Sequence, residues 1–172
     1  MSVRLRQTAD LPACVEALAE VHREDDYPTH WPSDPVSWLT PPGLLAAWVV
    51  ADSVGIQAHL ALVAGVKDDR LNEAARKPAD EIATITRLFV RPAARGNRLG
   101  ERLLRTAGTY AADHDLALVL DVVDEGRSAA IGLYERLGWH LVARRPAAWL
   151  MPSGDRPQLR IYVFPRPRPT DS

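Results

Sequence analysis

Hydrophobic residues alternate with polar ones in some segments of the chain and recur every three to four positions in others, which predicts both strands and helices. Strand patterns cover residues 3–6, 46–51, 55–64, 83–90, 116–123, 139–144 and 159–164. Helical spacing covers residues 12–22, 99–113 and 127–138. The order β-α-β-β-β-α-β-α-β-β predicts an α/β protein with one mixed sheet in a single domain, residues 1–164.

Local signals place the ends of some of these elements. Asp10 offers an N-cap for the first helix, and Pro12 suits its first turn. Gly138 predicts the end of the third helix. The near-continuous apolar run LALVLDVV at residues 116–123 is typical of a strand that is covered on both faces.

Three segments lack a regular pattern. Residues 23–43 begin with acidic residues and continue with prolines, a histidine and tryptophans, which predicts an ordered loop with short helical turns because proline interrupts long helices. Residues 67–80 are charged and poor in apolar side chains, as in an exposed loop. The last residues, 165–172 (PRPRPTDS), are expected to form a disordered tail.

Composition and charge narrow the functional classes. The formal net charge is −1, so the molecule as a whole does not attract nucleic acid, and any basic function is local. The single cysteine, Cys14, shares helical spacing with Leu11 and Leu18, which favours packing over nucleophilic chemistry. No apolar stretch has the length of a signal peptide or of a membrane span. We therefore expect a cytoplasmic protein that binds neither membranes nor nucleic acid.

The segment RPAARGNRLG, residues 91–100, joins a predicted strand to a predicted helix and is rich in arginine. Residues 87–105 hold six arginines and one acid, Glu101. The amides at a helix N-terminus bind anions, and glycines before it allow a close approach of the backbone. The alternative is a solvated helix surface. A P-loop is excluded because no Gly-Lys-Ser/Thr follows, and the Gly-x-Gly-x-x-Gly fingerprint is absent.

Two motifs resemble those of one enzyme family. The stretch ITRLFVRPAARGNRLGERLL resembles motif A of the GCN5-related N-acetyltransferases, and SAAIGLYERLGW resembles their motif B. Together the motifs span residues 81–145, with the expected separation. The resemblance implies a mostly antiparallel sheet of six to seven strands that is splayed between strands 83–90 and 116–123. It also implies direct acetyl transfer from acetyl-CoA to an amine in a ternary complex.

The resemblance assigns the cofactor contacts to motif A and to the start of motif B. The strand backbone would pair with the pantetheine arm, the turn would enclose the pyrophosphate, Arg102 would reach the 3′-phosphate, and two residues of motif B would hold the cofactor arm. In chain order these residues are Leu88, Phe89, Val90, Arg95, Gly96, Asn97, Arg98, Leu99, Gly100, Arg102, Arg127 and Ser128. Arg98 stands where the family has glycine and Arg127 where it often has asparagine, so the direction of the Arg98 side chain is open.

Acetyl transfer requires a base for the amine, a donor for the oxyanion and a proton for the departing sulfur. The family places a glutamate on the motif A strand, which makes Glu81 the first candidate base; the alternative is an exposed acid of the charged loop. His59 is the rival base, although a histidine inside a strand usually serves packing. Tyr134 matches the motif B tyrosine that approaches the sulfur, or it is a core residue. The Leu88 amide is the candidate oxyanion donor.

Residues 23–43 would cover the acetyl group in this family and supply the acceptor pocket. Its candidate acceptor-binding residues are Asp26, Tyr27, His30, Trp31 and Trp38. Packing of this loop onto the domain is the alternative for the aromatic side chains. We expect a small-molecule amine acceptor, no metal, and a monomer or homodimer. A protein N-terminal or lysine acetyltransferase and a non-catalytic acyl-CoA sensor are the alternative functions.

Overall fold

The computed structural model describes residues 1–65, 73, 75–124 and 128–164. Its seven strands form a sheet in the order β1-β2-β3-β4-β5-β7-β6. The strands are β1 Val3–Leu5, β2 Leu44–Ala51, β3 Ile56–Ala64, β4 Ile82–Val90, β5 Ala117–Val123, β6 His140–Pro146 and β7 Gln158–Val163. The helices are α1 Leu11–Asp25, α2 Pro35–Trp38, α4 Leu99–Asp113 and α5 Ala129–Arg136, with 3-10 turns η1 Thr8–Asp10, η2 Ala79–Glu81 and η3 Pro92–Ala94. The predicted strands and helices are confirmed.

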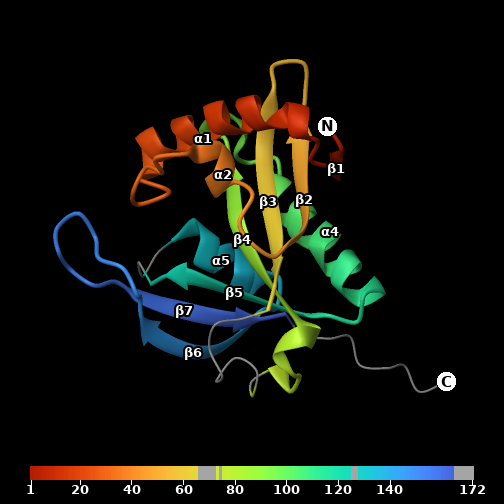
Figure 1. Ribbon diagram of the computed structural model, residues 1–172, viewed down its shortest axis with the longest axis vertical. Coiled ribbons are helices and arrows are strands. Elements are labelled where there is room, and N and C mark those ends of the chain that lie inside the picture. The colour runs from red at the N-terminus through yellow and green to blue at the C-terminus, as the bar shows by residue number, and fades with distance from the viewer. Residues whose placement is uncertain (66–72, 74, 125–127, 165–172) are drawn as a thin grey trace.

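The sheet opens between β4 and β5. These two strands are parallel and pair at only three positions, Ile82 with Ala117, Ala83 with Leu118 and Thr84 with Val119. The other neighbouring strands are antiparallel, and beyond Val119 β5 pairs with β7 only. Figure 1 shows the result: β2–β4 stand upright, whereas β5–β7 lie across the lower part of the molecule. The expected mostly antiparallel, splayed sheet is confirmed.

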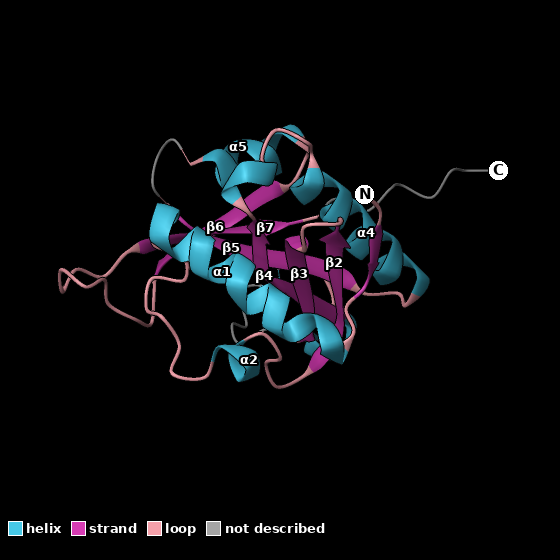
Figure 2. Cartoon of the chain, turned by 90° about the horizontal axis from the view of Figure 1, so that it is seen from above, coloured by secondary structure: helices cyan, strands magenta, loops and turns pink. Residues whose placement is uncertain are grey.

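Helices cover both faces of the sheet. Figure 2 shows α1 on one face and α4 with α5 on the other. On the α4 side, Leu103 and Leu104 belong to a core cluster that includes Leu60 and Tyr162. On the α1 side, a second cluster includes the fully buried Cys14. This burial confirms the predicted packing role, and it raises the pKa of the Cys14 thiol to about 11, which disfavours the reactive thiolate.

Two end signals have different outcomes. Gly138 ends α5 with a φ of +83°, a conformation that favours glycine, as predicted. Asp10 is the N-cap residue of α1, as predicted, but its side chain makes no capping hydrogen bond to the helix. Instead, its carboxylate accepts two hydrogen bonds of 2.7 and 2.8 Å from Arg4 and one of 2.7 Å from the Gln7 amide. Asp10 therefore ties β1 to the start of α1.

Two predicted segments fall partly or wholly outside the described residues. The expected disordered tail, residues 165–172, lies outside them, and so does most of the first half of the charged loop 67–80. Residues 23–43 are described throughout, and α2 is the short helical turn expected there. Among the described helices, none is long and apolar enough to cross a membrane.

Candidate functional site

A β-bulge in β4 lies beside the opening of the sheet. His59 of β3 pairs with Phe89 and Ala61 pairs with Thr86, so β4 has one residue more than β3 over this interval. The extra residue is at Arg87, whose φ is +54°. A bulge leaves backbone groups without ladder partners and increases the local twist. Because β4 has already left β5 at this point, the bulge presents backbone at the mouth of the opening.

His59 anchors this bulge. Its Nδ1 lies 2.8 Å from the Arg87 carbonyl oxygen and its Nε2 lies 2.9 Å from Nη1 of Arg6. A guanidinium can only donate, so Nε2 accepts and Nδ1 donates, which defines a neutral imidazole. The ring is fully buried and stacks on Phe89. Burial lowers the His59 pKa to about 4, with the Arg6 and Arg87 charges adding to the effect.

The burial of a neutral His59 makes the stability depend on pH. Below its ordinary pKa of 6.5 the ring gains a proton in the unfolded chain, whereas it stays neutral in the folded protein until about pH 4. Stability is therefore lost as the pH falls through this window. We expect the free energy of unfolding to fall by about 2 kcal/mol between pH 7 and pH 5 in urea titrations. In His59→Gln this fall should be smaller by that amount; an equal fall in both proteins contradicts the assignment.

Tyr134 lies on the other side of the opening, on α5. Its ring is 6% exposed and packs near Trp139 and Tyr162, but its hydroxyl has no hydrogen-bond partner in the described part of the chain. Burial raises the Tyr134 pKa well above its usual range, and the nearby Tyr27 and Asp121 raise it further. The hydroxyl therefore stays protonated at neutral pH and is free to donate. Of the motif B cofactor residues, Arg127 lies outside the described residues, and the Ser128 hydroxyl caps α5 by accepting from the amides of residues 130 and 131.

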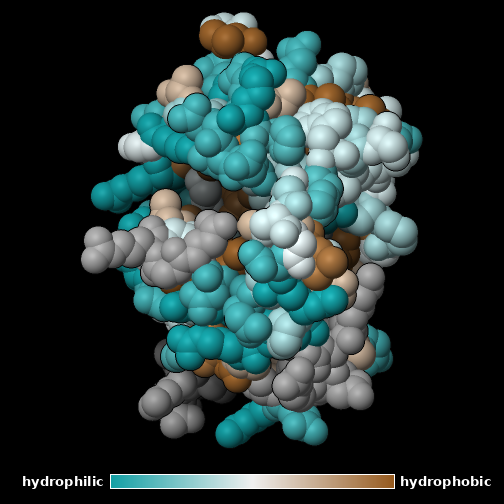
Figure 3. Space-filling model, turned by 90° about the vertical axis from the view of Figure 1, so that its left-hand side faces the viewer, coloured by the Kyte–Doolittle hydropathy of each residue, from teal (hydrophilic) through white to brown (hydrophobic). Residues whose placement is uncertain are grey.

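Three side chains meet on the α1 side of the opening, Tyr27, Trp38 and Arg87, and the charge of a fourth, Asp121 on β5, acts on Tyr27. The rings of Tyr27 and Trp38 meet edge to face at 6.1 Å, and the Arg87 guanidinium lies 3.9 Å above the Trp38 ring centre. Burial raises the Tyr27 pKa to about 12; the Arg87 charge opposes this shift and the Asp121 charge adds to it. We call these four residues the acceptor recess. Figure 3 shows the corresponding side of the molecule, where apolar atoms lie set back between hydrophilic ones.

Sequence reasoning missed two residues of the acceptor recess, Arg87 and Asp121. Each is the single charged residue in a strand segment that is otherwise uncharged, ATITRLFV for Arg87 and LALVLDVV for Asp121. A charge inside such a segment could have indicated a functional residue. Asp121 follows the last β4–β5 pair by two residues, and its carboxylate lies 3.7 Å from Nη2 of Arg145 on β6. The Asp121 side chain is partly exposed to solvent. Its partial loss of hydration raises its pKa, and the Arg145 charge opposes this shift without cancelling it.

The other residues predicted for the acceptor lie at the edge of the recess or outside it. Asp26 is exposed at the C-terminal end of α1, with a φ of +54°. The His30 ring lies 2.7 Å from the Leu150 carbonyl oxygen, which joins loop 26–34 to the loop between β6 and β7. Trp31 is 40% exposed and packs beside His22. Of the five predicted acceptor residues, the structure brings Tyr27 and Trp38 together.

Glu81 lies away from the acceptor recess. It ends η2 immediately before β4, at the closed end of the β4–β5 pair, and its carboxylate lies 3.5 Å from Nζ of Lys77. Leu88 is seven positions further along the chain, which is roughly 23 Å along an extended strand. The structure therefore does not bring Glu81 together with His59, Tyr134 and the bulge.

The turn between β4 and α4 is shaped for an anion. Gly96 has a φ of +85° and Arg98, the N-cap residue, has a φ of +57°. The amides of these two residues have no hydrogen-bond partner among the described residues, and the amides of the first turn of the 15-residue α4, which follow directly, have no partner within the helix. Gly96 is needed for its backbone conformation. Gly100 packs closely against α5, since a Cβ there would lie 3.4 Å from the Leu133 side chain.

The arginines around this turn have different partners. Arg95 pairs with Asp25 at the end of α1, and Arg102 donates to the Met1 carbonyl oxygen. The Asn97 side chain donates to the Ala94 carbonyl oxygen at 3.0 Å, which holds the turn. Arg98 has no carboxylate partner in the described part of the chain. The turn therefore keeps one arginine free beside its exposed amides.

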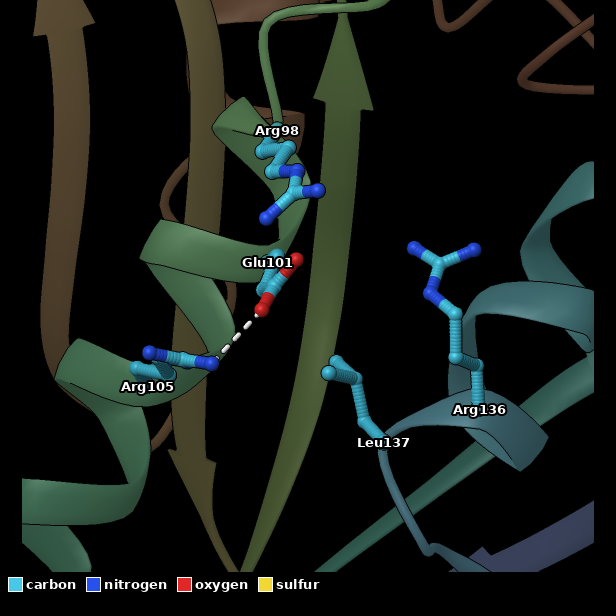
Figure 4. A pocket seen from close by; sticks show the side chains of 5 residues that line it. All are labelled: Arg98, Glu101, Arg105, Arg136 and Leu137. Carbon is cyan, nitrogen blue, oxygen red and sulfur yellow. Dashed lines mark hydrogen bonds and ion pairs between the residues drawn. The ribbon is translucent and has the colours of Figure 1, made fainter.

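Arg98 faces a groove between α4 and α5 with a volume of about 550 Å³. The groove is lined by Arg98, Glu101, Arg105, Arg136 and Leu137. Figure 4 shows Arg98 and Arg136 projecting from the two sides, with Glu101 paired to Arg105 at 2.7 Å. Among the described residues, neither Arg98 nor Arg136 has an acidic partner. One unpaired guanidinium at the N-terminus of α4 and a second across the groove fit the phosphates of a nucleotide cofactor.

Comparison with known proteins identifies a family and a fold. The family model described as "Acetyltransferase (GNAT) family" matches residues 13–139. The chain is similar to the structure of Arabidopsis thaliana NAA60 with acetyl-CoA (19% identity, 94% of this chain and 96% of that chain, TM-score 0.74). It is also similar to yncA from Salmonella typhimurium with acetyl-CoA (17%, 98% and 95%, 0.72) and to the ribosomal-protein-S18-alanine N-acetyltransferase from Escherichia coli (20%, 95% and 92%, 0.69). The curated protein sequences contain no match.

Proposed function

The chain belongs to the acetyltransferase (GNAT) family and is an acetyl-CoA-dependent N-acetyltransferase, and we propose that its acceptor is the amine of a small molecule. Direct transfer to the acceptor is supported by the position of the acceptor recess. It adjoins the β4 bulge on the α1 side of the sheet, while the anion-binding turn and the groove lie on the side of α4 and α5. Cofactor and acceptor would then meet from opposite sides at the opening between β4 and β5.

The residues of the turn and groove would hold acetyl-CoA, which supplies an activated acetyl thioester. The amides of Gly96, Arg98 and the first turn of α4 would bind the pyrophosphate, with Asn97 shaping the turn. The backbone of Leu88, Phe89 and Val90 would pair with the pantetheine arm. The guanidiniums of Arg98 and Arg136 would bind the 3′-phosphate, a role for which Arg102 is less suited because it bonds to Met1.

The proposed chemistry divides among three groups at the opening. The Leu88 amide, beside the bulge that His59 anchors, would donate to the acetyl carbonyl oxygen. The Tyr134 hydroxyl, protonated and without a partner, would give its proton to the departing sulfur. We assign the proton of the acceptor ammonium to the Asp121 carboxylate instead of Glu81 or His59, because its raised pKa makes it a better base than an ordinary aspartate.

The contact between His30 and Leu150 supports a small acceptor. It joins the loop after α1 to the loop between β6 and β7, and this connection would limit the room for a bulky acceptor on that side. A protein acceptor is the second candidate, since the similar Escherichia coli structure is an N-acetyltransferase of a ribosomal protein. A non-catalytic sensor would bind acetyl-CoA without turnover.

The test is release of free coenzyme A thiol from acetyl-CoA with three sets of acceptors: small amines, peptides with a free N-terminus and peptides with an internal lysine. We expect turnover with at least one small amine at a kcat/KM above that of every peptide. Faster turnover with a peptide would transfer the assignment to a protein acceptor. Cofactor binding without thiol release from any acceptor would favour a sensor.

Substitution of Gly96 tests the cofactor turn. Valine at a φ of +85° is strained by roughly 1–3 kcal/mol, and relief of the strain would redirect the free amides. We expect acetyl-CoA to raise the melting temperature of the wild type by several degrees and that of Gly96→Val by less than one degree. Gly154→Val is the matched control, because Gly154 has a φ of +89° and equally open surroundings but lies between β6 and β7. An unchanged shift in Gly96→Val contradicts the assignment of the turn.

A further inference from the structure

Arg87 carries a positive charge into the acceptor recess without an acidic partner. Its Nε donates to the Trp38 carbonyl oxygen at 2.9 Å and its Nη1 donates to the Thr86 hydroxyl at 3.1 Å. Within the described residues, its Nη2 has no hydrogen-bond partner and no carboxylate lies within ion-pair distance of the guanidinium. The side chain is half-buried, and burial lowers the Arg87 pKa, with the phenol of Tyr27 opposing this shift.

Two other arginines that are buried or half-buried show how the charge of a guanidinium is compensated elsewhere in this protein. Arg91 lies 3.0 Å from the Glu20 carboxylate. Arg6 donates to the Leu39 carbonyl oxygen, the Thr40 hydroxyl and the His59 ring, so both of its terminal nitrogens are used. Removing a charge from water is costly unless a counter-charge or enough hydrogen bonds compensate for it. Arg87 has neither a counter-charge nor a full set of bonds, and it lies where the acceptor would bind.

The guanidinium of Arg87 is also held in one place. Stacking on the Trp38 ring and the bond to the Trp38 carbonyl oxygen fix its plane, so little side-chain entropy remains to be lost on binding a ligand. The backbone at this position has a φ of +54°, which favours glycine over arginine. An arginine at such a position is explained by its side chain. A fixed guanidinium with a free edge recognises planar or tetrahedral oxyanions through paired hydrogen bonds.

A second charge, that of Asp121 on β5, acts on the same phenol as Arg87. The Arg87 charge lowers the pKa of Tyr27 and the Asp121 charge raises it, so groups of both signs act on this side chain. An acceptor with an ammonium and an anion would place the ammonium toward Asp121 and the anion toward Arg87. A plain alkylamine would leave the Arg87 charge without a partner.

We propose that Arg87 binds an anionic group of the acceptor, so that the preferred acceptor is a small amine that also carries a carboxylate or phosphonate, as in an amino acid. This inference rests on the proposed function, since it names the substrate class of the same site. It adds a specificity-determining residue, Arg87, on the acceptor side of the β4 bulge.

The experiment compares matched pairs of amines in the thiol-release assay. Each pair keeps the amine and changes the anion: an amino acid against its primary amide, and an aminoalkyl phosphonate against the corresponding alkylamine. In the wild type we expect kcat/KM to be about 10- to 100-fold higher for the anionic member of the preferred pair, the usual range for one charge-assisted contact. Whichever pair shows the larger ratio identifies carboxylate or phosphonate as the anion.

Variants assign the preference to Arg87. In Arg87→Gln the ratio should fall to below threefold. In Arg87→Lys it should fall only in part, because lysine keeps the charge but cannot form the paired hydrogen bonds of a guanidinium. Arg4→Gln, an exposed arginine on β1, should keep the wild-type ratio. A carboxylate or phosphonate analogue that lacks the amine should inhibit the wild type competitively against the acceptor and not against acetyl-CoA, which is informative even if Arg87→Gln does not fold.

The possible failures are distinct. If no small amine releases thiol, the proposed function is overturned and this inference with it. If small amines react but the acid and the neutral partner have equal kcat/KM, the proposed function stands and the inference is overturned. If the preference survives intact in Arg87→Gln, another residue binds the anion and the assignment to Arg87 is wrong.

Discussion

Replacing Tyr134 by phenylalanine is expected to lower kcat by about 100-fold and to leave acetyl-CoA binding within twofold of the wild type. The ring supports the core against Trp139 and Tyr162, and phenylalanine keeps that packing. The hydroxyl makes no hydrogen bond within the described residues, so its removal leaves no buried group unpaired. The loss would therefore appear in the chemical step. Steady-state kinetics with acetyl-CoA, together with the melting temperature, would measure it.

A matched substitution separates chemistry from packing. Tyr110 on α4 is half-buried, stacks on His114 and packs edge to face on Trp48 of β2, away from the opening between β4 and β5. Tyr110→Phe is expected to leave kcat within twofold of the wild type. If Tyr134→Phe has the same kcat as Tyr110→Phe, Tyr134 is a core residue and another group protonates the sulfur.

The fold could be predicted largely from sequence because its signals are local. Periodicity located the strands and helices, and errors occurred at element ends, where solvated residues carry no apolar signal: α1 continues from the predicted end near residue 22 to Asp25. The position of Asp10 at the N-cap of α1 was predicted correctly, but the role of its side chain was not. A cap is a local pattern, but Arg4 of the neighbouring strand provides a stronger charge-assisted partner for the same carboxylate.

The candidate site was predictable only where a single segment forms it. The turn at residues 91–100 contains its glycines, its helix N-terminus and its arginines in one stretch, so the sequence indicated an anion site before any contact was known. The acceptor recess depends on contacts between distant segments, such as Arg87 with Trp38, 49 residues apart. The bulge arises from the register of β4 against β3, which no pattern within β4 records. The direction of Arg98 likewise required the position of α5.

Reversing the charge of the two groove arginines is expected to have a similarly large effect on cofactor affinity. Each contributes one free guanidinium from one side of the groove, and a charge-assisted hydrogen bond to phosphate contributes roughly 1.5–3 kcal/mol. We expect Arg98→Glu and Arg136→Glu each to raise the acetyl-CoA Kd by about 10- to 100-fold, as measured by calorimetry. The effect should shrink at high salt, because exposed charges are screened.

A cofactor that lacks one phosphate provides the decisive control. Acetyl-CoA without its 3′-phosphate should bind the wild type more weakly, and its Kd should change little on reversal of Arg136, since the removed phosphate is the group that Arg136 would bind. Arg144→Glu, on β6, changes the net charge by the same amount and should leave both affinities unaltered. If Arg136→Glu weakens both cofactors equally, the groove acts through its overall field and not through a phosphate contact. Because Arg98 also borders the pyrophosphate turn, its reversal should weaken both cofactors, which distinguishes the roles of the two arginines.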